Sequence, residues 1–384
     1  MRTVICFGED WGRHPSTLQF IARQLAKDHT IIWIESLGLR RPKVTLADAQ
    51  RIWTKLRKWW CGPARDSRVS DNLIVCTPLV LPFHGSKLAQ FINRAILQKM
   101  IRRLVRDHSN GQAPVIVTAS PSTAYLIDCL GGAKSVYYCA DEYSQMPGVD
   151  SELVRRLEEN LLQRVDAVVV TSEYLLQRKR VAGTPIVLLR HGVDCEHFSN
   201  VVFQEMPELP PSLRIIPRPI FGYHGLIQSI IDFELMVEVA DRRPAWSLVF
   251  IGDHFGDTAS LPSRPNLYYL PAQSYDMIPW FIKGFDVCMM PYRLDERTMH
   301  CNPIKLREYL AAGKPVLSTP LPEVLLYRDV VELAGTADEF IRGGDKLLQE
   351  TGLEYVKKRT DRVSGESWET VARRFQDVLD SACA

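Results

Sequence analysis

The sequence predicts an α/β protein built from two doubly wound parallel sheets, and three observations lead to this prediction. Short apolar segments alternate with helical segments along the chain, as parallel sheets with helices on both faces require. The 384 residues suffice for two domains of about 150 to 200 residues each. A proline-rich stretch without sustained periodicity, residues 201–219, separates two such regions and is interpreted as an interdomain linker.

The first domain is expected to span residues 1–200. It opens with a β-α-β order, because a buried strand from Thr3 to Phe7 precedes a helix from about Thr17 to Lys27 and a strand from Thr30 to Glu35. The later elements alternate in the same way. They are strands at Pro114 to Ala119, Ser135 to Cys139, Ala167 to Thr171 and Pro185 to Leu189, and a helix at about Ser151 to Arg164.

The second domain is expected to span residues 218–365 and repeats this alternation. The predicted strands are Pro219 to Tyr223, Ser247 to Gly252, Leu267 to Leu270 and Asp286 to Pro291, and the predicted helices are Asp232 to Asp241 and Ser274 to Gly284. Gly225 directly follows the first of these strands. Because glycine has no side chain, the backbone there can approach a phosphate.

The segment from Tyr292 to Pro322 has the features of a phosphate-binding corner, since an apolar strand, a polar loop, a short helix and another strand follow one another. Asn302 is expected to cap the helix, Pro303 suits its first position and Gly313 ends it. The helix is therefore predicted from about Pro303 to Ala312.

Lys305 and Glu308 lie on one face of this predicted helix, beside an inward face formed by Leu306, Tyr309 and Leu310. A helix N-terminus with a lysine in its first turn suits a diphosphate. Glu308, one turn deeper, can accept hydrogen bonds from sugar hydroxyls. The alternative is that Lys305 and Glu308 form an ordinary surface ion pair.

The stretch NPIKLREYLAAGKPVLSTPLPEV resembles the donor-site segment of GT-B glycosyltransferases of the group 1 type, in which a helix glutamate, here Glu308, holds the ribose of a nucleotide sugar. The resemblance implies the GT-B architecture, two Rossmann-like domains facing one cleft, with a C-terminal helix (residues 366–384) that packs back on the first domain. It also implies a set of donor-binding residues. These are Gly225, Tyr292, Arg293, His300, Asn302, Pro303, Ile304, Lys305 and Glu308.

Two departures from the group 1 pattern bear on stereochemistry. The retaining enzymes of that group usually carry a second glutamate where this chain has His300, and an arginine and a lysine soon after the glycine that Gly225 matches. Both features are missing from this sequence, which favours inverting transfer. Lys305 is then the main cation for the leaving diphosphate, with Arg293 and Arg297 as further candidates.

The stretch SVYYCADEYSQ resembles the strand and turn that carry the catalytic aspartate in the GumK-type xanthan glucuronosyltransferases, which are inverting GT-B enzymes acting on a lipid-linked acceptor. Asp141 matches that aspartate, Lys305 matches a lysine of their donor segment, and His191 to Asp194 match their HGVD motif. A carboxylate at a strand end can deprotonate an acceptor hydroxyl. Glu142 is the second candidate for this base, and the alternative is that Asp141 only caps the following turn.

The loop after the first strand gathers Glu9, Asp10, Arg13 and His14 at the carboxyl end of that strand, where open parallel sheets bind ligands. It lacks the GxGxxG spacing of a dinucleotide site. We interpret these four residues as acceptor-binding, with simple loop solvation as the alternative.

The formal charge of +2 gives no reason to expect a polyanionic partner overall, and no nucleic-acid-binding motif is present. Positive charge is concentrated locally, because residues 40–68 hold nine Lys or Arg against two Asp, interleaved with tryptophans. Residues 79–106 form a second basic and apolar segment. Both are typical of helices that bind an anionic membrane surface, although amphipathic helices also commonly cover a protein core.

Several classes of site are not indicated. Asp253 and Asp257 are the nearest approach to a metal-binding pair and lie where GT-B enzymes need no cation, so no metal or cofactor beyond the nucleotide sugar is expected. The nine cysteines have no metal-ligand spacing, there is no signal peptide, and no run of about 18 apolar residues occurs. These features predict a cytosolic protein with reduced thiols.

The predicted function is a metal-independent glycosyltransferase that moves a sugar from a nucleotide donor, of the UDP type, to a lipid-linked saccharide during exopolysaccharide or envelope polysaccharide assembly. It is expected to be peripherally bound to the inner face of the plasma membrane. Two alternatives remain open. One is a sugar-nucleotide 2-epimerase of the same fold, and the other is a non-catalytic nucleotide-sugar-binding subunit.

Overall fold

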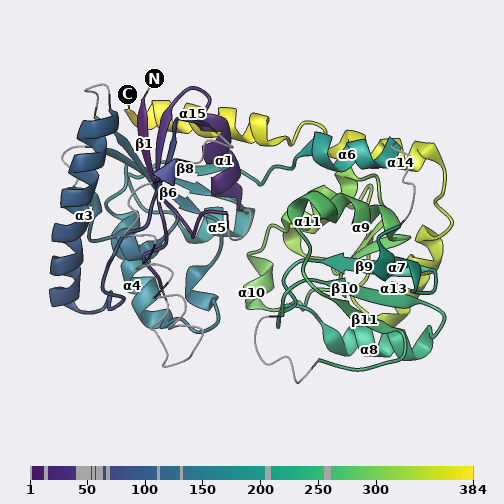
Figure 1. Cartoon of the computed structure of the whole chain (residues 1–384). Coiled ribbons are helices and arrows are strands. Elements are labelled where there is room, and N and C mark those ends of the chain that lie inside the picture. The colour runs from purple at the N-terminus through teal and green to yellow at the C-terminus, as the bar shows by residue number, and fades with distance from the viewer. Residues whose placement is uncertain are drawn as a thin grey trace. The chain divides into compact units, whose positions relative to one another are not determined.

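The structure is a computed structural model that describes residues 2–12, 16–39, 53, 57, 64–65, 70–109, 113–129, 133–203, 209–254 and 261–383. The chain divides into two compact units (Figure 1). Unit 1 comprises Met1–Arg190 together with Trp368–Ala384, and unit 2 comprises His191–Ser367.

Unit 1 is built on an eight-stranded sheet in the order β3-β4-β2-β1-β5-β6-β7-β8. All neighbouring strands are parallel except β3 and β4, which are antiparallel at one edge. The strands are rich in valine and isoleucine, which favour a pleated sheet buried on both faces. Their bounds are β1 Thr3–Phe7, β2 Thr30–Ile34, β3 Ala64–Arg65, β4 Leu73–Cys76, β5 Val115–Thr118, β6 Lys134–Cys139, β7 Ala167–Val170 and β8 Ile186–Leu188.

Four α-helices of unit 1 begin after Ser16, Ser86, Asp150 and Ser172, whose side chains accept hydrogen bonds from the first free amides. For example, Ser16 accepts from the backbone N–H of Gln19. The bounds are α1 Thr17–Leu25, α3 Lys87–His108, α4 Ser151–Leu162, α5 Glu173–Arg178 and α15 Trp368–Cys383, with short 3-10 helices η1 Pro121–Thr123, η2 Ile127–Cys129 and η3 Tyr143–Gln145. The C-terminal helix α15 packs on α1, where the rings of Phe20 and Trp368 stack 4.5 Å apart.

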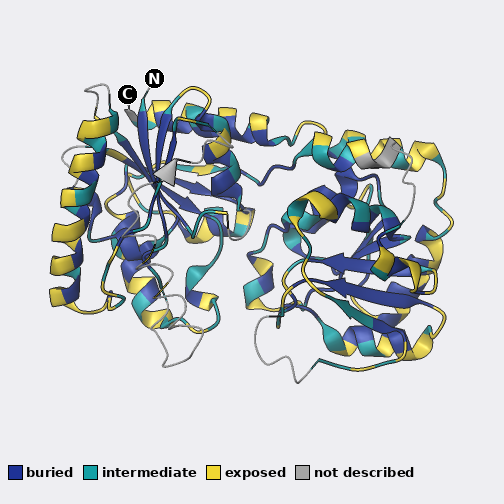
Figure 2. Ribbon diagram, viewed as in Figure 1, coloured by how far each residue is buried: buried dark blue, intermediate teal, exposed yellow. Residues whose placement is uncertain are grey.

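Unit 2 has a six-stranded parallel sheet in the order β11-β10-β9-β12-β13-β14. Its strands are β9 Ile220–His224, β10 Ser247–Ile251, β11 Leu267–Leu270, β12 Val287–Met290, β13 Val316–Ser318 and β14 Glu332–Leu333. Figure 2 shows the four central strands β10, β9, β12 and β13 as buried, like the central strands of unit 1. Two parallel α/β sheets were predicted from the sequence, and the structure confirms them.

The helices of unit 2 are α6 Cys195–Phe203, α7 Pro211–Arg214, α8 Phe233–Arg242, α9 Ile278–Gly284, α10 Glu296–Met299, α11 Ile304–Ala311, α12 Pro322–Leu325, α13 Ala337–Leu347 and α14 Leu353–Val363, with the 3-10 helix η5 Tyr275–Met277. The proline-rich stretch that we interpreted as a linker belongs to this unit and includes α7 and the end of α6. No helix in the described part of the chain is long and apolar enough to cross a membrane.

The strand order reverses once in each sheet, between β1 and β5 in unit 1 and between β9 and β12 in unit 2. Because the strands that meet there are parallel, the loops at their carboxyl ends lie on the same edge of the sheet. Ligands of open α/β sheets bind at this reversal. The fold thus directs attention to the loops that follow β1 and β5, and to those that follow β9 and β12.

Candidate donor and catalytic sites

Two glycines lie at the carboxyl edge of the sheet in unit 2. Gly225 follows β9 with φ of +117° and donates its N–H to the carbonyl of Ile251 at 2.8 Å. A Cβ atom on Gly225 would lie 2.1 Å from Cε of Lys305, and one on Gly252 would lie 2.0 Å from the carbonyl oxygen of Gly225. Side chains are therefore excluded at both positions, and the lysine lies directly against the β9 loop.

Helix α11 carries the predicted donor residues to this edge, but its cap differs from the prediction. The helix begins after Pro303 and has no side-chain cap hydrogen bond. The capping role predicted for Asn302 is wrong, because its Oδ1 instead accepts a hydrogen bond of 2.7 Å from Nη1 of Arg307. A buried guanidinium needs hydrogen-bond acceptors, and the side-chain oxygen of Asn302 is one of them.

Arg307 anchors α11 from its inner side. Its side chain is completely buried, its Nε donates to Glu366 at 2.7 Å, and its guanidinium lies 5.4 Å from the ring centroid of Tyr327. The sequence analysis did not single out this residue. With Leu306 and Tyr309 also fully buried, the inner face of α11 is fixed, so the orientation of its outer residues is fixed as well.

Lys305 is half-buried in the first turn of α11, and its ammonium lies 5.5 Å from the ring centroid of Tyr223, a cation–π contact. Among the described residues no carboxylate lies within ion-pair distance of it, Glu308 included. The alternative of an ordinary Lys305–Glu308 surface pair is therefore not what the structure shows. The ammonium is left with its hydrogen-bonding capacity for a ligand.

Glu308 is paired with a residue that the sequence analysis missed. Its Oε2 lies 3.0 Å from Nε2 of His224, the last residue of β9, and both residues are only 7% exposed. The two groups are in contact, but their geometry is not that of a hydrogen bond. Their attraction therefore depends on whether the imidazole is protonated. The backbone N–H of His224 donates to the hydroxyl of Tyr309 at 3.1 Å, which holds the strand end against α11. The available signal was a polar residue ending a buried strand directly before Gly225.

The other residues of the predicted donor set divide into buried and half-buried groups. Tyr292 and His300 are 3% and 1% exposed, and burial raises the pKa of Tyr292 well above its usual value. Pro303 is buried and Ile304 half-buried. Arg293 is half-buried, and its guanidinium lies 3.5 Å from the carboxylate of Glu234. The buried members can support the site. Because they are buried, they offer little surface that a ligand could contact.

Arg297 is tied to the loop that follows Gly225. Its guanidinium donates to Oε1 of Gln228 at 3.0 Å and to Oγ of Ser229 at 3.3 Å. These bonds connect the segment after β12 to the segment after β9, the two sides of the strand reversal. Arg297 therefore helps to shape the edge on which Lys305 lies.

In unit 1, Asp141 follows β6 at the carboxyl edge of the sheet and is half-buried. Its Oδ1 accepts a hydrogen bond of 2.8 Å from the backbone N–H of Glu142. Glu142 is more heavily engaged, since it binds the ammonium of Lys179 at 2.7 Å and the hydroxyl of Ser144 at 2.8 Å. Of the two predicted bases, Glu142 is therefore held in an ion pair with a buried lysine.

The predicted acceptor loop follows β1 on the same edge of this sheet. Glu9 and Asp10 are half-buried, and the carbonyl of Glu9 accepts a hydrogen bond of 2.9 Å from the indole of Trp33. Arg13 and His14 lie outside the described residues. Because β1 and β6 are both parallel members of one sheet, Glu9, Asp10 and Asp141 share its carboxyl edge.

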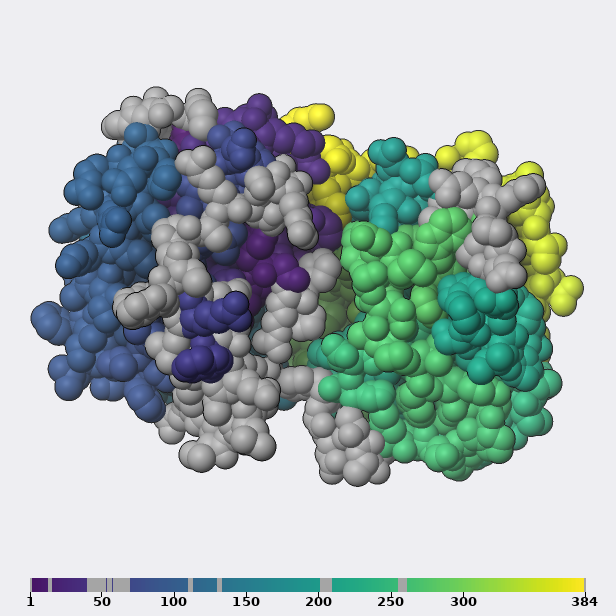
Figure 3. Space-filling model, viewed as in Figure 1, coloured from purple at the N-terminus to yellow at the C-terminus, as the bar shows by residue number. Residues whose placement is uncertain are grey.

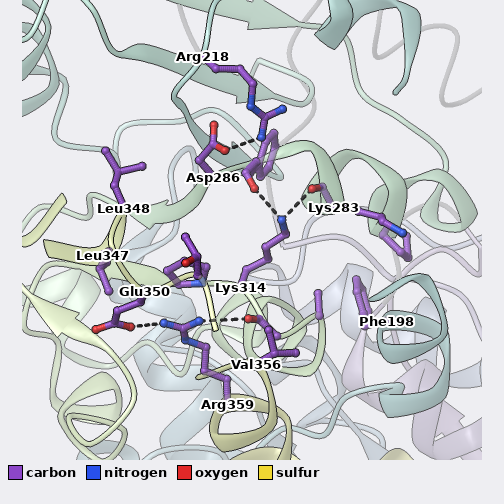
Figure 4. A pocket seen from close by; sticks show the side chains of 16 residues that line it. Phe198, Arg218, Lys283, Asp286, Lys314, Leu347, Leu348, Glu350, Val356 and Arg359 are labelled. Atoms are coloured by element: carbon purple, nitrogen blue, oxygen red, sulfur yellow. Dashed lines mark hydrogen bonds and ion pairs between the residues drawn. The ribbon is translucent and has the colours of Figure 1, made fainter. Parts of the chain in front are cut away.

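A cavity of about 370 Å³ in unit 2 lies at the opposite edge of the sheet, near the residues that precede β9, β12 and β13 (Figure 4). The ammonium of Lys314 donates to the carbonyls of Lys283 and Phe285, each at 2.7 Å. Arg218 pairs with Asp286, and Arg359 pairs with Glu350. These cations are matched within the protein, so this cavity is not the candidate donor site. Within the described residues, no group of three or more His, Cys, Asp or Glu side chains could hold a metal ion.

No protein-family model matches this chain. One curated relative, the Bacillus subtilis protein named "Putative teichuronic acid biosynthesis glycosyltransferase TuaH", is 25% identical over 315 residues, which cover 76% of this chain and 78% of the relative.

Solved structures resemble the whole chain. The HepE protein of Anabaena, in complex with UDP and glucose, matches with a TM-score of 0.69 and 12% identity over 99% of this chain and 100% of its own. Sucrose-phosphate synthase of Thermosynechococcus elongatus matches with a TM-score of 0.68 and 12% identity over 99% of both chains. At such low identity the likeness concerns the fold. The predicted GT-B fold is confirmed.

Proposed function

We propose that this protein is a glycosyltransferase that transfers a sugar from a UDP-sugar to a lipid-linked saccharide in the biosynthesis of an exopolysaccharide or envelope polysaccharide. The observation that carries the proposal is the position of Lys305, which reaches over Gly225 at the strand reversal without an ion-pair partner among the described residues. The relative from Bacillus subtilis, which is named a glycosyltransferase, and the HepE complex with UDP and glucose support the same function.

In this proposal the donor binds at the carboxyl edge of the unit 2 sheet. The ammonium of Lys305 and the first amides of α11 neutralise the diphosphate, which becomes the leaving group. Glu308 accepts hydrogen bonds from the ribose hydroxyls. These groups supply positive charge where negative charge develops in the transition state, so the proposed reaction needs no metal ion.

Asp141 is the proposed base, which takes the proton from the acceptor hydroxyl as the sugar leaves the diphosphate from its other side. This chemistry inverts the anomeric configuration. The similarity of SVYYCADEYSQ to the GumK-type enzymes supports the assignment, as does the near-complete burial of His300 where retaining relatives carry a second glutamate.

The surface of α3 supports a membrane-bound acceptor. This helix is 22 residues, or about 33 Å, long. Several apolar side chains on it and on the preceding loop face solvent, among them Phe83, Leu88 and Phe91 at 55%, 69% and 70% exposure. Figure 2 shows exposed positions along α3, and Figure 3 shows this segment at the surface. The exposed basic residues of the helix are Lys87, Arg94, Lys99, Arg102, Arg103 and Arg106. Apolar side chains beside basic ones suit an anionic lipid surface.

The preceding loop is held in place rather than loosely exposed. The side chain of Asn93, which is completely buried, accepts from the N–H of Leu81 at 2.7 Å and donates to its carbonyl at 2.8 Å. Leu81 and Phe83 are thereby kept at the surface beside α3. Because the cytoplasmic leaflet carries anionic lipid, we place the protein peripherally at the inner face of the plasma membrane. The second basic segment, with Trp59 and Trp60, lies mostly outside the described residues.

The decisive experiment incubates the purified protein with a panel of UDP-sugars and a polyprenyl-diphosphate-linked saccharide, and follows the products by mass spectrometry. The proposal expects UDP release coupled to growth of the lipid-linked saccharide by one sugar. An epimerised UDP-sugar without transfer would identify a 2-epimerase instead. Binding of UDP-sugars with neither reaction, across the panel, would identify a non-catalytic subunit.

A further inference from the structure

A buried ionic cluster lies behind the loop that carries Asp141. Lys179, directly after α5, is 6% exposed, and its ammonium lies 2.7 Å from Oε2 of Glu142 and 2.7 Å from Oε2 of Glu158. Glu158 comes from α4 and is 3% exposed. One cation therefore joins two carboxylates in a place that water barely reaches.

The remaining oxygens of these carboxylates are bound as well. The hydroxyl of Tyr137 donates to Oε1 of Glu158 at 2.6 Å, and the hydroxyl of Ser144 donates to Oε1 of Glu142 at 2.8 Å. Each of the four carboxylate oxygens thus has a protein partner. A fully satisfied buried network fixes the elements that contribute to it.

The charge state of the cluster is set by its own members. Burial by itself would lower the pKa of Lys179, but its interactions with Cys139 and with the carboxylates of Glu158 and Glu142 outweigh burial and raise that pKa above its usual value. The ammonium stays charged at physiological pH and holds the two glutamates together.

The cluster ties the loop to three elements at once. Tyr137 belongs to β6, Glu158 to α4 and Lys179 to the end of α5, while Glu142 and Ser144 belong to the loop itself. On the other side of Asp141, the carbonyl of Ala140 accepts a hydrogen bond of 2.9 Å from Thr171. The loop is therefore held immediately before and immediately after Asp141. The Glu142 N–H that binds Oδ1 of Asp141 is part of this held backbone.

From this arrangement we infer that Lys179 is a positioning residue for the reaction: it fixes residues 140–145 so that the carboxylate of Asp141 meets the acceptor hydroxyl. The inference rests on the proposed function for its catalytic consequence. Its structural part, the order of the loop, does not depend on which reaction the protein carries out. A base displaced by about 1 Å loses roughly a hundredfold in rate, so the positioning is worth as much as many direct contacts.

The test compares Lys179→Met, Lys179→Arg and the double variant Lys179→Met with Glu158→Gln. The double variant removes both members of the more deeply buried ion pair, so it avoids leaving Glu158 as an unpaired buried charge if the single variant fails to fold. We expect kcat of transfer to fall about 10- to 100-fold in both Met variants, partial rescue by Arg, and an unchanged Kd for UDP by calorimetry, because only loop order is altered. Lys134→Met is the matched control. Lys134 lies at the end of β6 that is remote from Asp141, and its ammonium forms a half-exposed ion pair of 3.2 Å with the carboxylate of Asp166.

Hydrogen exchange of the amides in residues 140–145 is the second readout. We expect faster exchange there in the Met variants than in the wild type or the Lys134→Met control. If the wild type transfers no sugar, the proposed function fails, while this readout still tests the positioning. Folded Met variants with wild-type exchange across the loop would overturn the inference, and so would wild-type kcat in a protein that transfers sugar.

Discussion

The imidazole of His224 lies 3.0 Å from the carboxylate of Glu308, which joins the end of β9 to the second turn of α11. Glu308 is the residue to which the sequence assigns the ribose. Its partner is not a lysine on the same helix but a histidine on a distant strand. The carboxylate is thus held by the sheet, and its position depends on the residue that directly precedes Gly225.

A double-mutant cycle tests this pairing. We expect His224→Ala to weaken UDP binding by roughly tenfold, and the double variant with Glu308→Ala to bind about as weakly as Glu308→Ala alone, because contacting residues couple by about 0.5–3 kcal/mol. Isothermal calorimetry measures the affinities, and thermal melting checks folding. Additive losses would mean that His224 acts independently of Glu308.

The donor residues themselves give a second prediction. Lys305→Ala and Glu308→Ala should each weaken UDP-sugar binding by about ten- to a hundredfold, since a charged hydrogen bond to a ligand is worth about 1.5–3 kcal/mol. Lys357→Ala, on the exposed face of α14, is the control and should bind as the wild type does. Calorimetric affinities that do not change in the first two variants would contradict the donor assignment.

Asp141 gives a third prediction, for turnover rather than binding. Asp141→Asn should lower kcat by roughly 100- to 10,000-fold, the span usual for general base catalysis, with little change in UDP affinity. Asp128→Asn, an exposed position of the same unit, is the control. NMR of the product should show inversion relative to the donor. A retained anomeric configuration would exclude Asp141 as the base of a single displacement.

The exposed face of α3 predicts binding to vesicles of phosphatidylcholine with phosphatidylglycerol, and weaker binding as salt screens the charges. Replacing Phe91 or Leu88 by serine should reduce flotation, since each buried apolar side chain is worth about 1.5–3 kcal/mol. Leu353→Ser is the matched control, because Leu353 is 75% exposed in unit 2. Equal flotation with pure phosphatidylcholine at low salt would remove the case for anionic lipid.

His191 predicts how stability changes with pH. Burial, together with the charge of Arg307, lowers its pKa to about 3 in the folded protein. In the unfolded chain the imidazole has an ordinary pKa of about 6.5, so between these two pKa values the unfolded chain binds a proton that the folded protein does not bind. Stability is retained above about pH 6.5 and falls below it by about 1.4 kcal/mol per pH unit until about pH 3.

The measurement is urea unfolding of the wild type and His191→Gln at about pH 7.5 and pH 5. The free energy of unfolding of the wild type relative to the variant should be about 2 kcal/mol lower at the acidic pH. The variant removes only the titrating group, so it serves as the control for every other acid-sensitive residue. A constant difference between the two proteins would show that His191 does not titrate in this way.

The elements of the fold were largely readable from the sequence because each strand is a continuous apolar run bounded by polar loops. The strand Thr3–Phe7 and the strand Leu267–Leu270 have the predicted bounds, and Leu306, Tyr309 and Leu310 are buried as the helical period requires. The short edge strands β3 and β14 were not predicted, since two residues carry no periodicity, and the four-residue strand β4 was not predicted either.

The candidate site was less readable, because its partners come from distant parts of the chain. Asn302 has the chemistry of a cap, yet the buried Arg307 takes its oxygen. Glu308 has a lysine nearby in sequence, yet it pairs with His224. Local pattern identifies which residues can cap or pair, but burial and tertiary contacts decide which partner each one has.

The packing of α15 on unit 1 has a consequence for biosynthesis. Trp368 stacks on Phe20, and Phe375 meets Tyr138 edge to face at 5.9 Å, so the last helix covers apolar side chains from the beginning and middle of unit 1. All of unit 2 is translated before this helix emerges. The apolar surface of unit 1 that α15 covers therefore stays exposed while unit 2 is being translated. A chaperone, or another nascent chain, can bind to this surface before α15 is synthesised.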